Sequence, residues 1–151
     1  MVTNYKILNQ QLTALIEDEP NIIANLSNAA ALLFTTLKDI NWAGFYILDE
    51  ETLILGPFQG NPACVRIKVG SGVCGTAIEK GTTMRVEDVN QFDGHIACDA
   101  NSKSEIVIPI KGKNGYYGVL DIDAPITKRF SEEDQRGLET FVDLLEQHLK
   151  F

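Results

Sequence analysis

The spacing of apolar residues changes at Asn41, and this change constrains the fold more than any other feature of the chain. Before it, apolar residues recur three and four positions apart, which predicts two helices, residues 5–19 and 21–38. Pro20 separates the two helices, and Asn21 is a favourable cap for the second. After Asn41, short apolar runs alternate with glycine and proline, as in strands and turns.

The second part of the chain predicts strands around one short helix, followed by a final helix. The expected strands are residues 42–48, 52–55, 64–69, 83–86, 105–110 and 116–123, and the short helix is residues 73–79. Residues 56–62 are expected to form a loop because glycines and prolines interrupt them. Residues 87–104 form a long irregular segment, and segments of that length are usually functional. Ser131 and Asp134 fit a capping box for the last helix.

This order of elements predicts an α+β domain with a central antiparallel sheet. The N- and C-terminal helices are expected to pack on one face, and loops to wall a ligand pocket on the other. With 151 residues, the whole chain, 1–151, is expected to form a single domain.

The composition narrows the classes of partner and location. A net charge of −8 argues against binding to nucleic acid or to an anionic membrane surface. No N-terminal targeting segment is visible, and the longest apolar run, residues 29–34, is too short to cross a bilayer, so the cytoplasm is the expected location. Three cysteines in such a chain indicate free or catalytic thiols rather than a disulfide framework.

Three carboxylates lie on two strands that are expected to pair. Glu105 opens one strand, Asp121 and Asp123 lie on the next, and an Asn-Gly turn at 114–115 joins the two. Strand alternation places Tyr117 on the same face as the two aspartates, while the hairpin register stays open. If the three acids converge, burial and repulsion raise the pKa of at least one, which can then donate a proton near neutral pH. The alternative is a solvated sheet face.

The cysteines suggest redox chemistry. Cys98 lies in the polar stretch 94–105, Cys74 lies in the first turn of a predicted helix whose dipole stabilises a thiolate, and Cys64 follows a Gly/Pro loop. This arrangement fits a nucleophile with one or two resolving partners. Buried inert thiols are one alternative. A zinc site is another, although the cysteine spacings match no standard zinc pattern.

Two further features have simpler interpretations. The run GSGVCG at 70–75 satisfies the dinucleotide-binding pattern, but it lies outside the repeated strand–helix–strand units that such a fold needs. Trp42 and Tyr46 share a strand face, where core packing is the simpler reading and the wall of an apolar pocket is the other.

Six segments resemble a known family. They are LGPFQG (55–60), ACVRI (63–67), GVCGTA (72–77), GHIACD (94–99), SEIV (104–107) and GVLDID (118–123). They are similar to the free methionine-(R)-sulfoxide reductases, a GAF-domain family, and the flanking helices suit a GAF fold. Asp93 is a small departure, because the family pattern has a proline before Gly94.

The resemblance implies reduction of free L-methionine (R)-sulfoxide to L-methionine. Cys98 would attack the sulfoxide sulfur, and Glu105 would protonate or hydrogen-bond the sulfoxide oxygen. Asp121 and Asp123 would assist and bind the ammonium group, and the aromatic pair of the strand 42–48 would receive the methyl end.

The resemblance also implies how the thiol is regenerated. Cys64 or Cys74 would close a disulfide on the Cys98 sulfenic acid, and thioredoxin or a similar thiol donor would reopen it. No cofactor or metal is expected. Cys74 has the better dipole argument as nucleophile, but Cys98 has the nearer carboxylate and is preferred. The alternative function is a GAF sensor module that binds a small ligand without turnover, and the oligomeric state, including a homodimer, stays open.

Overall fold

The computed structural model describes residues 2–94, 98 and 100–151. Its elements, in chain order, are α1 (Tyr5–Ile16), α2 (Ile22–Thr36), β1 (Trp42–Asp49), β2 (Thr52–Gly60), β3 (Arg66–Lys68), α3 (Gly72–Lys80), β4 (Met84–Val86), the 3-10 turn η1 (Val89–Gln91), β5 (Ser104–Gly112), β6 (Gly115–Ala124) and α4 (Glu132–Leu149). The helices of this described part are all too short or too polar to span a membrane.

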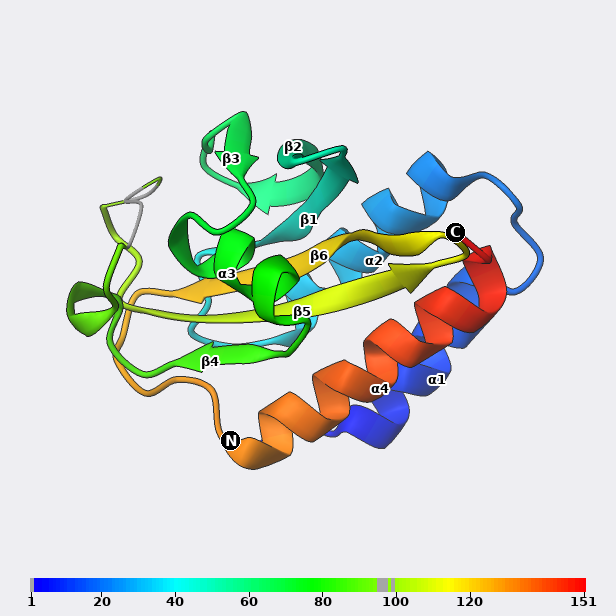
Figure 1. Ribbon diagram of the computed structural model, residues 1–151. Coiled ribbons are helices and arrows are strands. Elements are labelled where there is room, and N and C mark those ends of the chain that lie inside the picture. The colour runs from blue at the N-terminus through cyan, green and yellow to red at the C-terminus, as the bar shows by residue number, and fades with distance from the viewer. Residues whose placement is uncertain (1, 95–97, 99) are drawn as a thin grey trace.

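The six strands form one sheet in the order β3-β2-β1-β6-β5-β4, with every neighbouring pair antiparallel. Helices α1, α2 and α4 bury one face of this sheet, while α3 packs on the other (Figure 1). The predicted α+β fold, with the terminal helices on one face, is confirmed. The opposite face is covered by α3 as well as by loops.

The helices begin where the sequence predicts. The Asn21 side chain accepts a hydrogen bond from the Ala24 amide at the start of α2. At α4, the Ser131 hydroxyl accepts from the Asp134 amide and the Asp134 carboxylate accepts from the Ser131 amide, so the capping box is confirmed. Helix α1 ends at Ile16, one turn before Pro20.

The expected loop at residues 56–62 is wrong for residues 56–60, because β2 continues to Gly60. The pairing between β1 and β2 shifts between Gly44 and Tyr46, which leaves Gly56 and Pro57 together opposite one residue of β1. An irregular pair of this kind is where a sheet tolerates glycine and proline, so these residues do not end the strand.

A second register shift corrects the expected orientation of Tyr117. The pairing between β5 and β6 shifts between Ile110 and Lys111, so that the alternation of β6 changes at this point. Tyr117 therefore packs on the helical side, where its ring stacks on Phe151 with 3.9 Å between ring centroids. Tyr116 packs on the other side, and beyond the shift the expected alternation holds.

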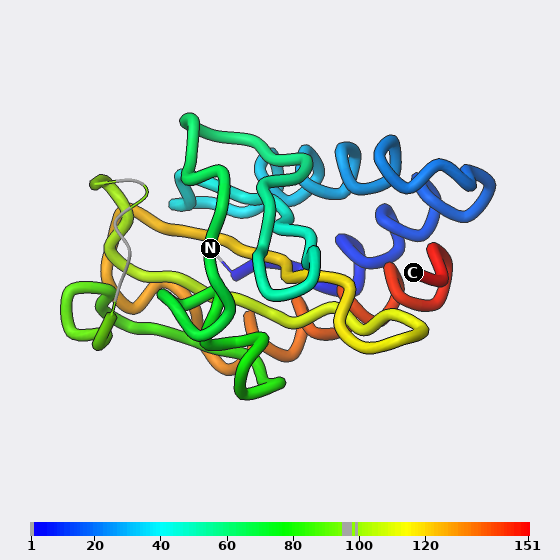
Figure 2. The backbone as a smooth tube through the Cα atoms, turned by 45° about the horizontal axis from the view of Figure 1, so that its top comes forward, coloured from blue at the N-terminus to red at the C-terminus, as the bar shows by residue number. Residues whose placement is uncertain are grey.

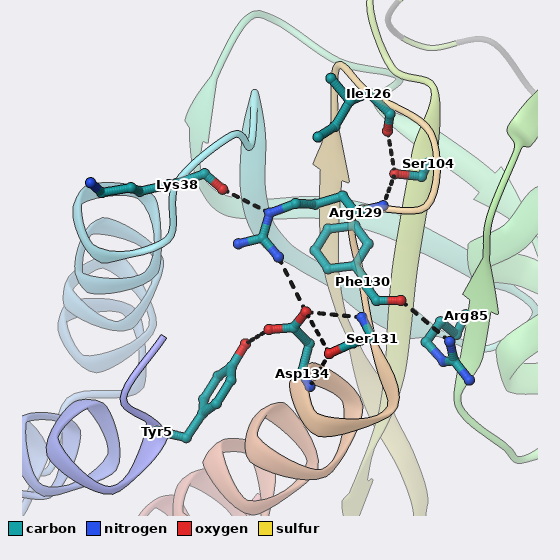
Figure 3. A network of polar contacts seen from close by, with 9 residues as sticks. All are labelled: Tyr5, Lys38, Arg85, Ser104, Ile126, Arg129, Phe130, Ser131 and Asp134. Carbon is teal, nitrogen blue, oxygen red and sulfur yellow. Dashed lines mark hydrogen bonds and ion pairs between the residues drawn. The ribbon is translucent and has the colours of Figure 1, made fainter. Parts of the chain in front are cut away.

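A polar network ties the helical layer to the start of β5 (Figure 3). Asp134 accepts hydrogen bonds from the Tyr5 hydroxyl at 2.5 Å and from the Arg129 guanidinium at 3.2 Å. The Arg129 amide donates to the Ser104 hydroxyl oxygen at 3.3 Å, and the Ser104 hydroxyl donates to the carbonyl oxygen of Ile126 at 2.6 Å. The network therefore anchors the start of β5, at the residue before Glu105.

The described residues of the connection 87–103 lie at the end of the sheet away from the C-terminus, in both views of the chain (Figures 1 and 2). Its two ends are held to the rest of the fold. The Lys128 amide donates to the carbonyl oxygen of Glu87, and the Lys103 amide donates to the carbonyl oxygen of Ala124. This long connection is therefore anchored where it leaves and re-enters the sheet.

Candidate active site

A small cavity lies on the α3 side of the sheet. Its volume is about 40 Å³, which is room for a few waters. Its lining comes from β1, the β2–β3 connection, β3, α3, the 87–103 connection, β5 and β6: Trp42, Tyr46, Ala63, Ile67, Gly72, Val73, Cys74, Cys98, Ser102, Glu105, Asp121 and Asp123. All the candidate residues predicted from the sequence are in this lining except Cys64, which is bonded to a residue that is.

The sheet register brings the three acids together. Glu105 on β5 lies opposite Asp123 on β6, and Asp123 lies opposite Trp42 on β1. Residues directly opposite each other share a face, and Asp121, two positions before Asp123, lies on that face as well. The side chains of Glu105 and Asp121 are buried, at 8% and 5% exposed. The solvated-face alternative is therefore wrong for this pair.

The acids are coupled to one another. Burial raises the pKa of Glu105 well above its ordinary value, and the charges of Asp121 and Asp123 raise it further. Hydrogen bonds also join the Glu105 carboxyl group to those of Asp121 and Asp123. Glu105 therefore holds a proton at a pH where an exposed glutamate has lost it, inside a cavity that it shares with a sulfur atom.

The pKa of the Cys74 thiol is not what the helix-dipole argument predicts. It lies in the first turn of α3, but its side chain is buried, and burial raises the pKa of its thiol, followed by the charges of Asp121, Glu105 and Asp123. A hydrogen bond also joins Cys74 to Asp121. The expected low pKa of Cys74 is therefore wrong, because desolvation and three acids outweigh one helix end.

The sulfur of Cys74 and carboxyl oxygens of Glu105 and Asp121 lie within 4.8 Å of one another, close enough to hold a metal ion. Such a site would use one thiol and two carboxylates, not the set of cysteines that the zinc alternative considered. In the structure, Glu105 is hydrogen-bonded to Asp121, and Asp121 is hydrogen-bonded to the thiol of Cys74.

Cys64 and Cys98 form a disulfide, with 5.3 Å between their Cα atoms and a separation of 34 positions in the sequence. Both are half-buried, and Cys74 is the remaining free thiol. Cys98 lines the cavity from the 87–103 connection, and Cys64, which is outside the lining, lies in the β2–β3 connection. Residues 95–97 and 99, which belong to the 94–99 motif, lie outside the described residues.

Comparisons with known proteins show the family of the chain. The GAF domain family model matches residues 20–149. A protein of Escherichia coli called free methionine-R-sulfoxide reductase is 55% identical over 96% of this chain and 88% of its own length. A Saccharomyces cerevisiae protein of the same name is 45% identical over 97% and 87%. The chain belongs to the free methionine-R-sulfoxide reductase family of GAF domains.

Solved structures of this family superpose closely on the chain. The reduced form of the Staphylococcus aureus enzyme is 58% identical, covers 98% of this chain and 96% of its own, and has a TM-score of 0.95. The Neisseria meningitidis enzyme in complex with its substrate is 38% identical, covers 99% and 92%, and has a TM-score of 0.93. Membership of this family makes the protein an oxidoreductase.

The aromatic cluster around Trp42 in this GAF-domain site is larger than the sequence pattern indicates. Trp42 stacks on Tyr46, at 5.9 Å between ring centroids, and on Phe58, at 5.1 Å. Phe58 itself is not in the cavity lining. Phe58 was missed because its segment was expected to be a loop, and the register shift hides its alternation. Ser102, which accepts a hydrogen bond from the Asn41 side chain at 3.2 Å, was also missed. Its position between Cys98 and Glu105 was the available signal.

Proposed function

We propose that the protein reduces free L-methionine (R)-sulfoxide to L-methionine with a thiol as the source of electrons. One observation carries the proposal: Cys98, bonded to Cys64, lines the same cavity as Glu105, an acid whose pKa is raised. The kinship with enzymes named for this reaction, at 55% identity for the E. coli protein, supports the choice of substrate.

The first step uses the thiol of Cys98 and the carboxyl group of Glu105 together. The sulfur of Cys98 attacks the sulfoxide sulfur, and Glu105 donates its proton to the oxygen, because a sulfoxide is a poor electrophile until that oxygen is protonated. The oxygen passes to Cys98 as a sulfenic acid and methionine leaves, so the substrate sulfur gains the two electrons that the Cys98 sulfur loses. The raised pKa of Glu105 supports this role, since the group keeps a proton to give.

The aspartates and the aromatic residues bind the substrate in this proposal. Asp121 and Asp123 attract the ammonium group of a free amino acid, which compensates their buried charge. Trp42, backed by Phe58, and Tyr46 offer an apolar surface to the methyl end. The closed lining favours a free amino acid over a peptide chain, which would need an open path on both sides of the residue.

Cys64 resolves the sulfenic acid in the proposed cycle. Its sulfur attacks Cys98, the S–O bond breaks, and the oxygen leaves as water. The disulfide between these two residues supports Cys64 over Cys74 in this role, and Cys74 instead contacts Asp121. Thioredoxin or a similar dithiol in the cytoplasm reopens the half-exposed bond. Residues 1–151 act as one GAF-like domain without a cofactor, and a homodimer stays a prediction.

The test is direct. The reduced protein is incubated with free methionine (R)-sulfoxide and dithiothreitol, and released methionine is quantified, with the (S) epimer as a control. Methionine from the (R) epimer, and its loss in Cys98→Ser, is the expected result. Tight binding of the sulfoxide with no methionine released would instead identify a sensor module.

A further inference from the structure

The connection between β2 and β3, residues 61–65, carries Cys64 but has no regular secondary structure. Hydrogen bonds nevertheless hold it at both ends. The Trp42 indole nitrogen donates to the carbonyl oxygen of Asn61 at 3.1 Å, and the Leu55 amide donates to the carbonyl oxygen of Val65 at 2.9 Å. The loop is therefore restrained on either side of its cysteine.

A third hydrogen bond is made to the backbone of Cys64 itself. The Tyr46 hydroxyl donates to the carbonyl oxygen of Cys64 at 2.8 Å. Tyr46 is 2% exposed and its ring stacks on Trp42, so packing limits the positions that its hydroxyl can take. Burial raises the pKa of Tyr46, as do the nearby acids, so the phenol keeps its proton and remains a donor.

We propose that Tyr46 is a positioning residue for disulfide closure, holding Cys64 where its sulfur can reach the sulfenic acid on Cys98. The inference deepens the proposed function, since it assumes Cys98 as the oxidised sulfur and Cys64 as its partner. In the step concerned, the Cys64 sulfur bonds to the Cys98 sulfur while the S–O bond breaks. The oxygen leaves as water with the thiol proton of Cys64, so no further oxidant is needed. The hydroxyl thus has a role separate from that of the aromatic ring.

Tyr46→Phe tests this role because it removes the hydroxyl and keeps the ring. Tyr116→Phe is a matched control: Tyr116 packs on the same side of the sheet, donates to the carbonyl oxygen of Gly81 at 3.4 Å, and is not in the cavity lining. Both variants are first checked for cooperative thermal unfolding. The reduced proteins are then oxidised with hydrogen peroxide, which transfers one oxygen to a thiol and leaves water, in the presence of a dimedone-type sulfenic acid trap.

The measured quantity is the ratio of trapped Cys98 to Cys64–Cys98 disulfide, by peptide mass spectrometry. We expect the ratio to rise roughly three- to tenfold in Tyr46→Phe, the effect of losing one hydrogen bond of ordinary strength. Tyr116→Phe should match the wild type. Single-turnover methionine release is measured in parallel, because the ring of Tyr46 also lines the cavity.

Two results would overturn the inference. One is an unchanged ratio in Tyr46→Phe, and the other is a slower methionine release with no change in the ratio, which would assign the hydroxyl to the substrate. The peroxide experiment does not depend on the substrate. A protein that closes the disulfide with peroxide but never releases methionine would therefore refute the proposed function and leave the role of Tyr46 standing.

Discussion

Glu105 is buried and lies against two other acids, and both conditions raise the pKa of its carboxyl group. If it is the proton donor, Glu105→Gln should lower the single-turnover rate of methionine release by about a hundredfold or more, since an amide keeps the shape and lacks the proton. Rapid-quench measurement of methionine gives this rate. Glu133→Gln, an exposed change in α4, should leave it unaltered, and an equal rate in Glu105→Gln would remove Glu105 from the acid role.

The same carboxyl group predicts how stability depends on pH. Its pKa is raised in the folded state above the ordinary 4.5, so the folded protein binds the proton more tightly than the unfolded chain does. The free energy of unfolding should therefore fall as the pH rises from about 5 toward the raised value. Glu105→Gln should show a smaller fall over that range, measured by urea unfolding at a series of pH values. A parallel pH dependence in the two proteins would contradict the assignment.

The elements themselves were predictable where the pattern is local. The caps at Asn21 and Ser131 and the face of the two aspartates follow from side-chain chemistry and from alternation near the strand end. The continuation of β2 through Pro57 and the orientation of Tyr117 could not be predicted in this way, because each depends on a register shift. Such a shift is decided by the partner strand, which a single run of residues does not reveal.

Ser104 joins β5 to the connection between β6 and α4, so its loss should destabilise more of the fold than β5 alone. Ser104→Ala removes the donor to the Ile126 carbonyl and the acceptor of the Arg129 amide, both at a buried site. We expect a loss of about 1–3 kcal/mol in the free energy of unfolding. Ser27→Ala, an exposed position in α2, should change it by less than about 0.5 kcal/mol. Equal losses in the two variants would show that the network of Figure 3 contributes little.

At the scale of the whole molecule, the site joins segments that are distant in sequence. The pairing of Cys64 with Cys98 across 34 residues depends on the path of two connections at the same end of the cavity, and no spacing rule predicts it. The dipole argument for Cys74 failed for a related reason, because its pKa is raised first by burial in the folded protein and then by acids that come from β5 and β6. The local sequence pattern therefore identified the cysteines as candidates, whereas only the tertiary structure shows which two form the disulfide and which one is buried among the acids.

The disulfide state also predicts a change in substrate affinity. The cavity has room for a few waters when Cys64 and Cys98 are bonded, which is less than a free amino acid needs. The oxidised protein should therefore bind methionine sulfoxide at least about tenfold more weakly than the Cys64→Ser/Cys98→Ser variant, measured by isothermal titration calorimetry. Equal affinities would show that the disulfide does not close the cavity to the substrate.

The central claim is that Cys98 takes the oxygen of the substrate beside a protonated Glu105. The most direct test is one turnover of the Cys64→Ser variant with free methionine (R)-sulfoxide, with a sulfenic acid trap and peptide mass spectrometry. The account predicts one methionine released per chain and the trap on Cys98. The trap on Cys74, with Cys98 still a thiol, would contradict it.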